Sequence, residues 1–207
     1  MNNKEQTRMA YNAIAKQYYE LYKDDKTDLM YFNEFLDTCG NEILDLGCGM
    51  GHYANYMQNK GFNVTGVDFS SGMLDIARDK YQNVNYIEED VCDLSFLGEK
   101  KYDGIVLAYL LQHISKEEGN GLINDLLKHL KPHAKLLILT REGNRNLKEP
   151  EPFEPRFIYE INEYNQETIT TLLNNNWSIS KIEIKDPVDD EYSVSPNTLV
   201  VMATYKG

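Results

Sequence analysis

Three glycines at alternate positions mark the part of the sequence best suited to bind a ligand. Gly47, Gly49 and Gly51 follow an apolar run over 42–46 and precede an amphipathic stretch over 52–60. Glycine permits turns with positive φ and lets the backbone approach a ligand closely, and the first turn of a helix presents unpaired N–H groups. We therefore expect this loop to bind a small, flat molecule.

The spacing of the glycines departs from the fingerprint of dinucleotide-binding proteins. That fingerprint, G-x-G-x-x-G, needs a glycine at the third place after its second glycine. Counting from Gly49, this place is His52, and the glycine falls at Gly51 instead. A nicotinamide or flavin dinucleotide is therefore disfavoured, although the shift of one glycine is weak evidence by itself.

Three aspartates accompany three successive apolar runs. Asp45 lies inside the end of the first run, Asp68 ends the second, and Asp90 follows the third. Ligands of open parallel sheets bind beyond the carboxyl ends of the strands, so we expect the three carboxylates to converge on one crevice. The second suits the hydroxyls of a ribose and the third an exocyclic amine, whereas Asp45 beside the glycine loop favours a cation over a pyrophosphate. These residues predict an adenosine that carries a positive charge.

Each aspartate also has a purely structural interpretation. Asp45 could cap a turn, Asp68 could be a helix N-cap, and Asp90 has acidic neighbours and could belong to a solvated turn. Their joint occurrence after successive strands favours the binding site.

The elements that must position these residues alternate along the chain. From residue 41 onward, short apolar runs are separated by amphipathic stretches, which is typical of βαβ units on a mostly parallel sheet. The last two runs are separated by a stretch without helical period, so we expect them to form an antiparallel hairpin. The expected strands span 42–46, 63–67, 84–87, 104–109, 135–140, 178–184 and 198–204, and the expected helices span 52–60, 71–80, 116–130 and 166–175.

Two regions lie outside this alternation. Residues 7–22 carry apolar side chains on one broad helical face, and a second helical stretch covers 29–36. Residues 141–156 hold three prolines, mixed charges and no apolar period, so we expect a loop, and long loops in compact domains are often functional. Three arginines of this segment could grip a substrate carboxylate or remain solvated, namely Arg141, Arg145 and Arg156.

Composition limits the ligands and partners. The chain has 207 residues, which favours one domain, and its 21 Lys and Arg against 33 Asp and Glu give a formal net charge of −12. Such a charge repels a phosphate backbone, so a small-molecule substrate is favoured over nucleic acid. No apolar run approaches a membrane span, no signal peptide is evident, and the three cysteines are irregularly spaced. We expect a cytoplasmic monomer or homodimer with reduced thiols, no membrane contact and no metal site.

At the glycine loop and the three aspartates, the chain resembles the class I S-adenosylmethionine-dependent methyltransferases. The resemblance covers residues 43–140, and its most specific segments are Leu44-Asp-Leu-Gly-Cys-Gly-Met-Gly51, Gly66-Val-Asp-Phe-Ser-Ser-Gly-Met-Leu-Asp-Ile-Ala-Arg78 and Glu89-Asp-Val91. It implies an α/β fold, a Rossmann-like, doubly wound sheet of seven strands, mostly parallel with an antiparallel last strand, and helices on both faces. We expect one methyltransferase domain over 1–207, with a helical lid over 1–40, a cofactor-binding core over 41–141 and a substrate-side segment over 142–207.

The resemblance also implies which residues surround the cofactor, S-adenosyl-L-methionine. In the family, the glycine loop wraps the methionine part, the acid after the second strand holds the ribose, and the acid after the third strand reads the adenine edge. Met73 would pack near the adenine, and Ala108 ends the strand that lies beside the sulfonium. Cys48, between two glycines, is a packing residue rather than a nucleophile. The residues so assigned to the cofactor are Asp45, Gly47, Cys48, Gly49, Gly51, Asp68, Phe69, Met73, Asp90, Val91 and Ala108.

A histidine and two tyrosines are expected near the substrate. His113 follows the fourth expected strand, where family members often carry a histidine, and as a general base it could take a proton from a hydroxyl or an amine. A histidine that orients a loop explains the position at least as well. Tyr11 and Tyr18 lie on the leading helix, from which the family closes an aromatic side chain over the cofactor, although plain helix packing also explains them.

The expected function is methyl transfer from S-adenosylmethionine to an unidentified small-molecule acceptor by direct displacement. Such an enzyme mainly supplies alignment and excludes water, so the lack of an obvious catalytic dyad is no objection. The segment after the fourth strand lacks the Asn/Asp-Pro-Pro-aromatic motif of amino-group methylation on adenine or glutamine. Two alternatives stay open: a non-catalytic module that binds S-adenosylmethionine, and a nicotinamide-dependent oxidoreductase, which His52 and Asp45 disfavour.

Overall fold

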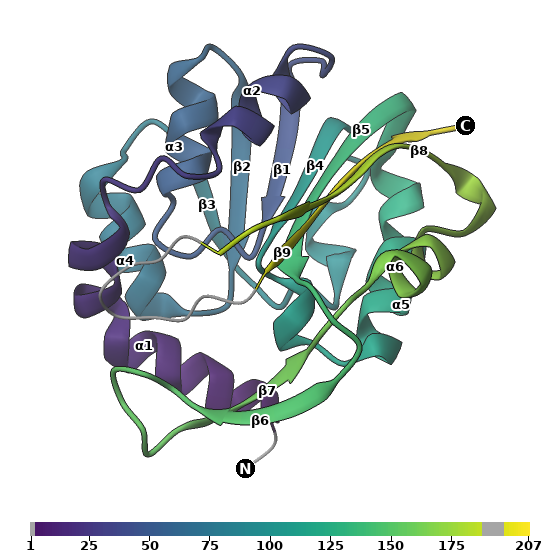
Figure 1. The fold of residues 1–207 in the computed structure, drawn as a ribbon. Coiled ribbons are helices and arrows are strands. Elements are labelled where there is room, and N and C mark those ends of the chain that lie inside the picture. Colours follow the sequence, from purple (N-terminus) through teal and green to yellow (C-terminus); the bar gives the residue numbers. More distant parts are fainter. Residues whose placement is uncertain (1–2, 188–196) are drawn as a thin grey trace.

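A seven-stranded sheet forms the centre of the protein in a computed structural model that describes residues 3–187 and 197–207 (Figure 1). The order of its strands is β3-β2-β1-β4-β5-β9-β8. Neighbouring strands are parallel except around β9, which is antiparallel to both β5 and β8. The seven expected strands and the antiparallel last strand are thereby confirmed. Their bounds are β1 Glu42–Leu46, β2 Asn63–Asp68, β3 Asn85–Glu88, β4 Tyr102–Ala108, β5 Leu130–Arg141, β8 Trp177–Lys185 and β9 Thr198–Tyr205.

Helices cover both faces of the sheet, as expected for a doubly wound fold. Neighbouring residues of a strand point to opposite faces, and β5 shows the result: Leu136 and Ile138 join one apolar cluster, whereas Leu137 and Leu139 join another. The first cluster includes side chains of α5 and α6, and the second includes side chains of α2 and α3. The bounds of these helices are α2 Leu29–Leu36, α3 His52–Asn59, α5 Lys116–Leu126 and α6 Gln166–Leu173.

The helix expected over 116–130 ends earlier than its apolar period suggests. The α-helix α5 stops at Leu126, a 3-10 turn covers Leu127–His129, and Leu130 opens β5. Pro132 lies two residues further on, and a proline disfavours helical backbone at the residue before it. Leu130 is nevertheless buried in the same apolar cluster as α5. The apolar period therefore predicted correctly that Leu130 is buried, but the prediction that it belongs to the helix was wrong.

The segment expected as a loop over 141–156 contains a strand instead. Strand β6, Asn146–Pro150, pairs antiparallel with β7, Ile158–Asn162, in a separate two-stranded ribbon. No residue of β6 is fully buried, and Leu147 is its only aliphatic side chain, so the alternation that would reveal a strand is absent from the sequence.

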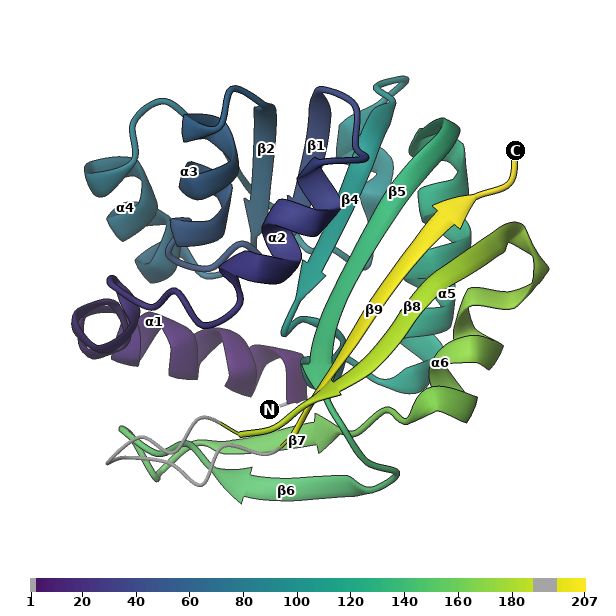
Figure 2. The same ribbon diagram turned by 45° about the horizontal axis from the view of Figure 1, so that its top comes forward.

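The first helix, α1 (Asn3–Tyr22), lies along the carboxyl ends of the central parallel strands. Figure 2 shows it between the sheet and the β6–β7 ribbon. One side of α1 packs with Met50 and with Met73 of α4 (Ser71–Lys80), and Ala10 packs against Tyr159 and Ile161 of β7. The sheet edge at which a ligand would bind is thus covered by α1. Within residues 3–187 and 197–207, no helix combines the length and the apolar character needed to cross a membrane.

Candidate functional site

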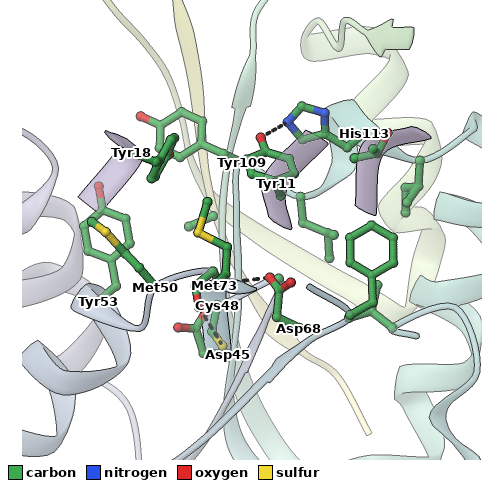
Figure 3. A pocket seen from close by; sticks show the side chains of 18 of the residues that line it. Tyr11, Tyr18, Asp45, Cys48, Met50, Tyr53, Asp68, Met73, Tyr109 and His113 are labelled. Atoms are coloured by element: carbon green, nitrogen blue, oxygen red, sulfur yellow. Dashed lines mark hydrogen bonds between the residues drawn. The ribbon is translucent and has the colours of Figure 1, made fainter. Parts of the chain in front are cut away.

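A cavity of about 940 Å³, its open mouth included, lies between α1 and the carboxyl ends of β1, β2 and β4 (Figure 3). The structure brings almost all of the predicted site residues to its wall. Those that line it are Tyr11, Tyr18, Asp45, Gly47, Cys48, Gly49, Asp68, Phe69, Met73, Asp90, Val91, Ala108 and His113. Gly51 is the one predicted site residue that does not line it.

The glycine loop has the backbone that its sequence predicts. Gly47, Gly49 and Gly51 have φ angles of 74°, 52° and 78°, all in the region that favours glycine. Gly51 is the N-cap of α3, and a Cβ built on it would clash with the hydroxyl of Tyr86. Gly51 therefore has a structural reason to be glycine, whereas Gly49 faces open space.

Asp68 ties the glycine loop to the end of β2. Its Oδ2 accepts a hydrogen bond from the Gly49 amide at 2.9 Å, and its Oδ1 accepts one from the Ser70 amide at 2.8 Å. The N-cap of α4 is Ser70, so the interpretation of Asp68 as that cap is wrong. Burial raises the pKa of Asp68, although the amide hydrogen bonds oppose this shift.

Asp45 is the least satisfied carboxylate of the cavity wall. Its side chain is only 2% exposed, and its Oδ2 has no hydrogen-bond partner among the described residues. Burial, reinforced by the nearby charge of Asp68, raises the pKa of Asp45 to about 7. An unpartnered buried carboxylate oxygen is costly, and a bound cation would relieve that cost and favour the charged form.

Asp90 contacts a lysine that the sequence interpretation missed. Its carboxylate accepts from Lys4 Nζ at 2.8 Å and from the Cys92 amide at 2.9 Å, and Lys4 also pairs with Glu118 at 3.1 Å. Burial would raise the pKa of Asp90, but the hydrogen bonds from Lys4 and Cys92 outweigh it and hold the pKa below its usual value. The start of α1 is thus fastened over the end of β3. A lysine in the first turn of an amphipathic helix gives no sequence signal for this contact.

An aromatic cluster closes the cavity opposite the carboxylates. The hydroxyl of Tyr11 lies 2.9 Å from Nε2 of His113, and the Tyr11 ring stacks on Tyr159 of β7 with centroids 5.6 Å apart. Tyr18 meets Tyr11 edge to face at 6.1 Å. Burial lowers the pKa of His113 to about 4, so its imidazole is neutral at pH 7 and has a lone pair to offer.

A second histidine of the cavity wall was not assigned to the site from the sequence. His52 begins α3 and lines the cavity, where its ring lies against that of Tyr53 with centroids 3.7 Å apart. Its Nδ1 is buried without a hydrogen-bond partner among the described residues. Burial lowers the pKa of His52 to about 4, so this ring is also neutral at pH 7.

Tyr53 and Tyr109, which also line the cavity, are held by one buried aspartate. Asp28, 1% exposed, accepts hydrogen bonds from Tyr53 Oη at 2.7 Å, from Tyr109 Oη at 2.8 Å and from Lys185 Nζ at 2.6 Å. Tyr109 has a φ of 59°, which is unusual for a residue with a side chain and is often found at functional sites. These four residues come from four distant parts of the sequence, so no local pattern could have grouped them.

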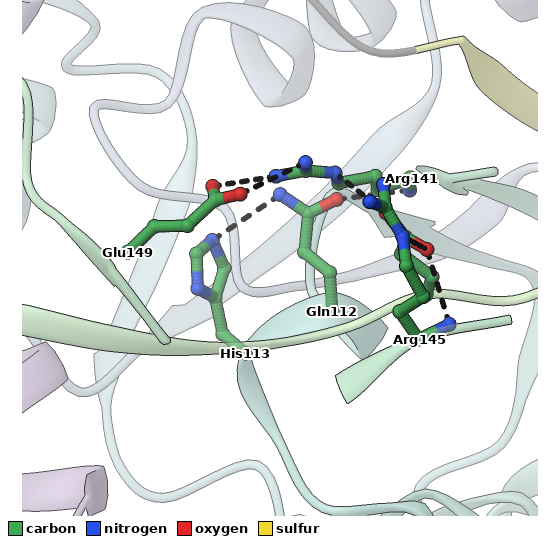
Figure 4. A network of polar contacts seen from close by, with 6 residues as sticks. Gln112, His113, Arg141, Arg145 and Glu149 are labelled. Carbon is green, nitrogen blue, oxygen red and sulfur yellow. Dashed lines mark hydrogen bonds and ion pairs between the residues drawn. The ribbon is translucent and has the colours of Figure 1, made fainter. Parts of the chain in front are cut away.

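The three arginines of residues 141–156 are engaged with carboxylates of the same chain. Arg141 forms a bidentate pair with Glu149 at 2.7 and 3.0 Å, and Arg145 contacts Glu163 at 2.9 and 2.8 Å (Figure 4). Arg156 lies 3.4 Å from Glu154. The expectation that they grip a substrate carboxylate therefore gains no support from the geometry.

No set of His, Cys, Asp and Glu side chains within residues 3–187 and 197–207 is arranged to hold a metal ion. Burial raises the pKa of the Cys48 thiol, which keeps it protonated and fits a packing residue.

Several known proteins similar to this chain are methyltransferases. Residues 43–133 match the family model described as a methyltransferase domain. The chain is 30% identical over 124 residues to the ubiquinone biosynthesis O-methyltransferase of Coxiella burnetii. This alignment covers 58% of the chain and 51% of that protein. The chain is also 34% identical over 104 residues to the demethylmenaquinone methyltransferase of Tropheryma whipplei. This second alignment covers 49% of the chain and 42% of that protein.

The fold matches solved structures over its whole length. The magnesium protoporphyrin IX methyltransferase of Synechocystis, solved with bound S-adenosylmethionine, superposes with a TM-score of 0.73 at 17% identity and covers 100% of this chain and 98% of its own. This likeness establishes the fold. The chain spans about half of the length, or less, of the curated relatives it matches.

Proposed function

We propose that the chain is a class I S-adenosylmethionine-dependent methyltransferase and that it transfers a methyl group from S-adenosylmethionine to a small-molecule acceptor; its match to a methyltransferase domain and its similarity to curated methyltransferases support this. The observation that carries this proposal is the pair of buried carboxylates, Asp45 and Asp68, between the glycine loop and the aromatic cluster. The positive charge of a cationic adenosine ligand would attract the unpartnered carboxylate oxygen of Asp45, whereas the negative charge of a pyrophosphate would be repelled there.

The residues of the cavity fit such a ligand part by part. Each carboxylate oxygen of Asp68 accepts one hydrogen bond from a main-chain N–H and keeps a lone pair that could accept a second hydrogen bond from a ribose hydroxyl. Asp90 would accept from the adenine amine, for which Lys4 must share or release the carboxylate. When bound, S-adenosylmethionine supplies an electrophilic methyl group on a sulfonium. The chain itself aligns the acceptor and excludes water behind Tyr11 and Tyr18.

The acceptor that we propose is a small molecule without a carboxylate at the site. The names of the curated relatives refer to ubiquinone biosynthesis and to demethylmenaquinone, and quinones of this kind are small ring molecules without a carboxylate. Two neutral histidines and a cluster of tyrosines surround the acceptor side, and the guanidinium groups of Arg141, Arg145 and Arg156 are already paired with carboxylates. An uncharged acceptor with an aromatic ring suits such a wall.

Isothermal titration calorimetry with S-adenosylmethionine and with NADH tests the cofactor. We expect binding of the first and none of the second, and Asp68→Ala should weaken binding by about 100-fold or more because hydrogen bonds to a charged group are lost. The exposed Asp75→Ala on α4 is the matched control and should bind normally. Preference for NADH would overturn the proposal.

Methyl transfer itself needs a separate measurement. A panel of small phenols, quinols and amines is incubated with S-adenosylmethionine labelled on its methyl group, and we expect label in at least one acceptor. Binding without transfer to any acceptor would favour the non-catalytic module instead.

A further inference from the structure

We propose that Gln112 is a positioning residue that fixes the tautomer of His113, with the proton on Nδ1 and the lone pair of Nε2 turned to the Tyr11 hydroxyl. The tautomer is independent of the proposed function, and only its use in methyl transfer rests on that function. Gln112 and His113 belong to the 3-10 turn Leu111–His113, which follows β4.

The orientation of the Gln112 amide is set by the backbone of β5. The main-chain N–H of Arg141 lies 3.0 Å from Oε1 of Gln112. A main-chain N–H can only donate, so the side-chain atom that it meets must be the carbonyl oxygen. The other end of the amide, its NH₂ group, is therefore the end that lies 3.4 Å from Nε2 of His113 (Figure 4).

This orientation determines where the imidazole carries its proton. An NH₂ group has only protons to offer, so Nε2 of the neutral ring must present its lone pair, and the ring proton is on Nδ1. The hydroxyl of Tyr11, 2.9 Å from the same Nε2, then donates as well. Nδ1 has no hydrogen-bond partner among the described residues, so no donor at that atom holds the ring in the other tautomer.

The groups on both sides of Gln112 are held by contacts of their own. Arg141 ends β5, and its guanidinium is held by Glu149 and lies 3.2 Å from Glu163. His113 itself packs edge to face against Tyr11 and Tyr159, with centroids 5.5 and 5.4 Å away. The amide is thus clamped between a strand end and an aromatic cluster, and it cannot flip without losing the bond to the Arg141 amide.

The consequence for methyl transfer concerns Tyr11. Because its own proton points to Nε2, its oxygen keeps lone pairs for a proton donor in the cavity. As the acceptor atom bonds to the methyl carbon and the bond from that carbon to sulfur breaks, with its electron pair left on sulfur, the acceptor proton passes to Tyr11 Oη. The Tyr11 proton passes to Nε2 of His113 at the same time. The positive charge lost at sulfur reappears on the imidazolium, so the net charge of the cavity is unchanged.

Nitrogen-15 NMR of the full chain with labelled histidine tests the tautomer without any cofactor or acceptor. The signals of His113, assigned by their loss in His113→Asn, should show a protonated Nδ1 and an unprotonated Nε2 at pH 7. The opposite pattern in the unmodified protein would overturn the inference.

Two variants separate Gln112 from Tyr11 as the cause. Gln112→Glu keeps an oxygen for the Arg141 amide and presents a second oxygen to the ring, so the proton should move to Nε2. Tyr11→Phe should leave it on Nδ1, because the Gln112 NH₂ group remains. The exposed Gln82→Glu is the matched control and should change nothing. A tautomer that follows Tyr11→Phe and ignores Gln112→Glu contradicts the proposal.

Should Gln112→Glu fail to fold, Gln112→Met removes the NH₂ donor and should give both tautomers, whereas a single Nδ1–H form there would contradict the role of Gln112. Once an acceptor is known, Gln112→Glu should lower kcat by about 100-fold, the low end of general acid–base effects, with an unchanged Kd for S-adenosylmethionine. Absence of turnover with every acceptor would defeat the proposed function and leave the tautomer result intact. Full activity of Gln112→Glu with a reversed tautomer would show that methyl transfer does not use this proton path.

Discussion

Asp45 is the residue whose chemistry depends most on whether a cation is bound. In the unliganded protein its buried carboxyl has a pKa of about 7, because burial and Asp68 disfavour its charge. A sulfonium or ammonium nearby would reverse this preference. Its position in the sequence, inside the end of an apolar run, predicted a special role, but only the structure shows that one oxygen lacks a partner.

The pH dependence of binding tests this residue. The ionised form of Asp45 attracts the cation, so the affinity for S-adenosylmethionine should rise as the pH increases through about 7 and level off above it. Asp45→Asn cannot ionise and should bind more weakly with a flat profile between pH 6 and pH 8. Calorimetry at four pH values measures both, and an equally steep profile in the variant would assign the proton to another group.

The residues that the sequence identified share one property, which is that their signals are local. The glycine loop and the acids of the strand ends each occupy a strand-loop-helix segment, where spacing alone reports geometry. Asp28 shows the opposite case. Its hydrogen bonds reach 25, 81 and 157 residues along the chain, and no periodicity records contacts of that kind.

At the scale of elements, Asp28 joins the start of α2 to α3 and to the ends of β4 and β8. Its removal leaves Lys185 without its buried partner and frees two tyrosine hydroxyls. Removing one partner of a buried ion pair destabilises a protein by about 3–5 kcal/mol, because the other charge is left buried and unpaired. Asp28→Ala should therefore lower the free energy of unfolding by roughly that amount. Urea unfolding followed by circular dichroism measures it, and the exposed Asp37→Ala at the end of α2 is the control. A loss below about 1 kcal/mol would contradict this role.

Strand β6 shows why one element escaped the sequence interpretation. It pairs with β7 at the edge of the molecule, leaves no side chain fully buried, and ends at a proline. Burial on one face is what gives a strand its alternating apolar pattern, and of the two half-buried positions of β6, Leu147 and Glu149, only the first is apolar. Helices α2 to α6 have an apolar face against the sheet, and their positions were confirmed to within a few residues.

At the scale of the whole molecule, the charge of −12 favours the approach of a cation. S-adenosylmethionine carries one net positive charge, so its association rate constant should fall as salt shortens the Debye length from about 30 Å at 0.01 M to about 8 Å at 0.15 M. S-adenosylhomocysteine lacks the sulfonium charge and is the matched control. Stopped-flow binding measures both rates, and an identical salt dependence for the two ligands would show that net charge does not steer association.

The position of α1 also sets the order in which the molecule can be completed. Helix α1 emerges from the ribosome before the apolar residues it packs against, because these lie later in the sequence. They are Met50, Met73, Tyr159 and Ile161. During synthesis one side of α1 can pack once α4 has emerged, but the side that faces the ribbon has no docking surface until strand β7 has emerged, more than a hundred residues after α1. Helix α1 is synthesised first, but both of its sides are covered only after β7 has emerged, so a nascent chain completes the cover of this cavity late in its translation.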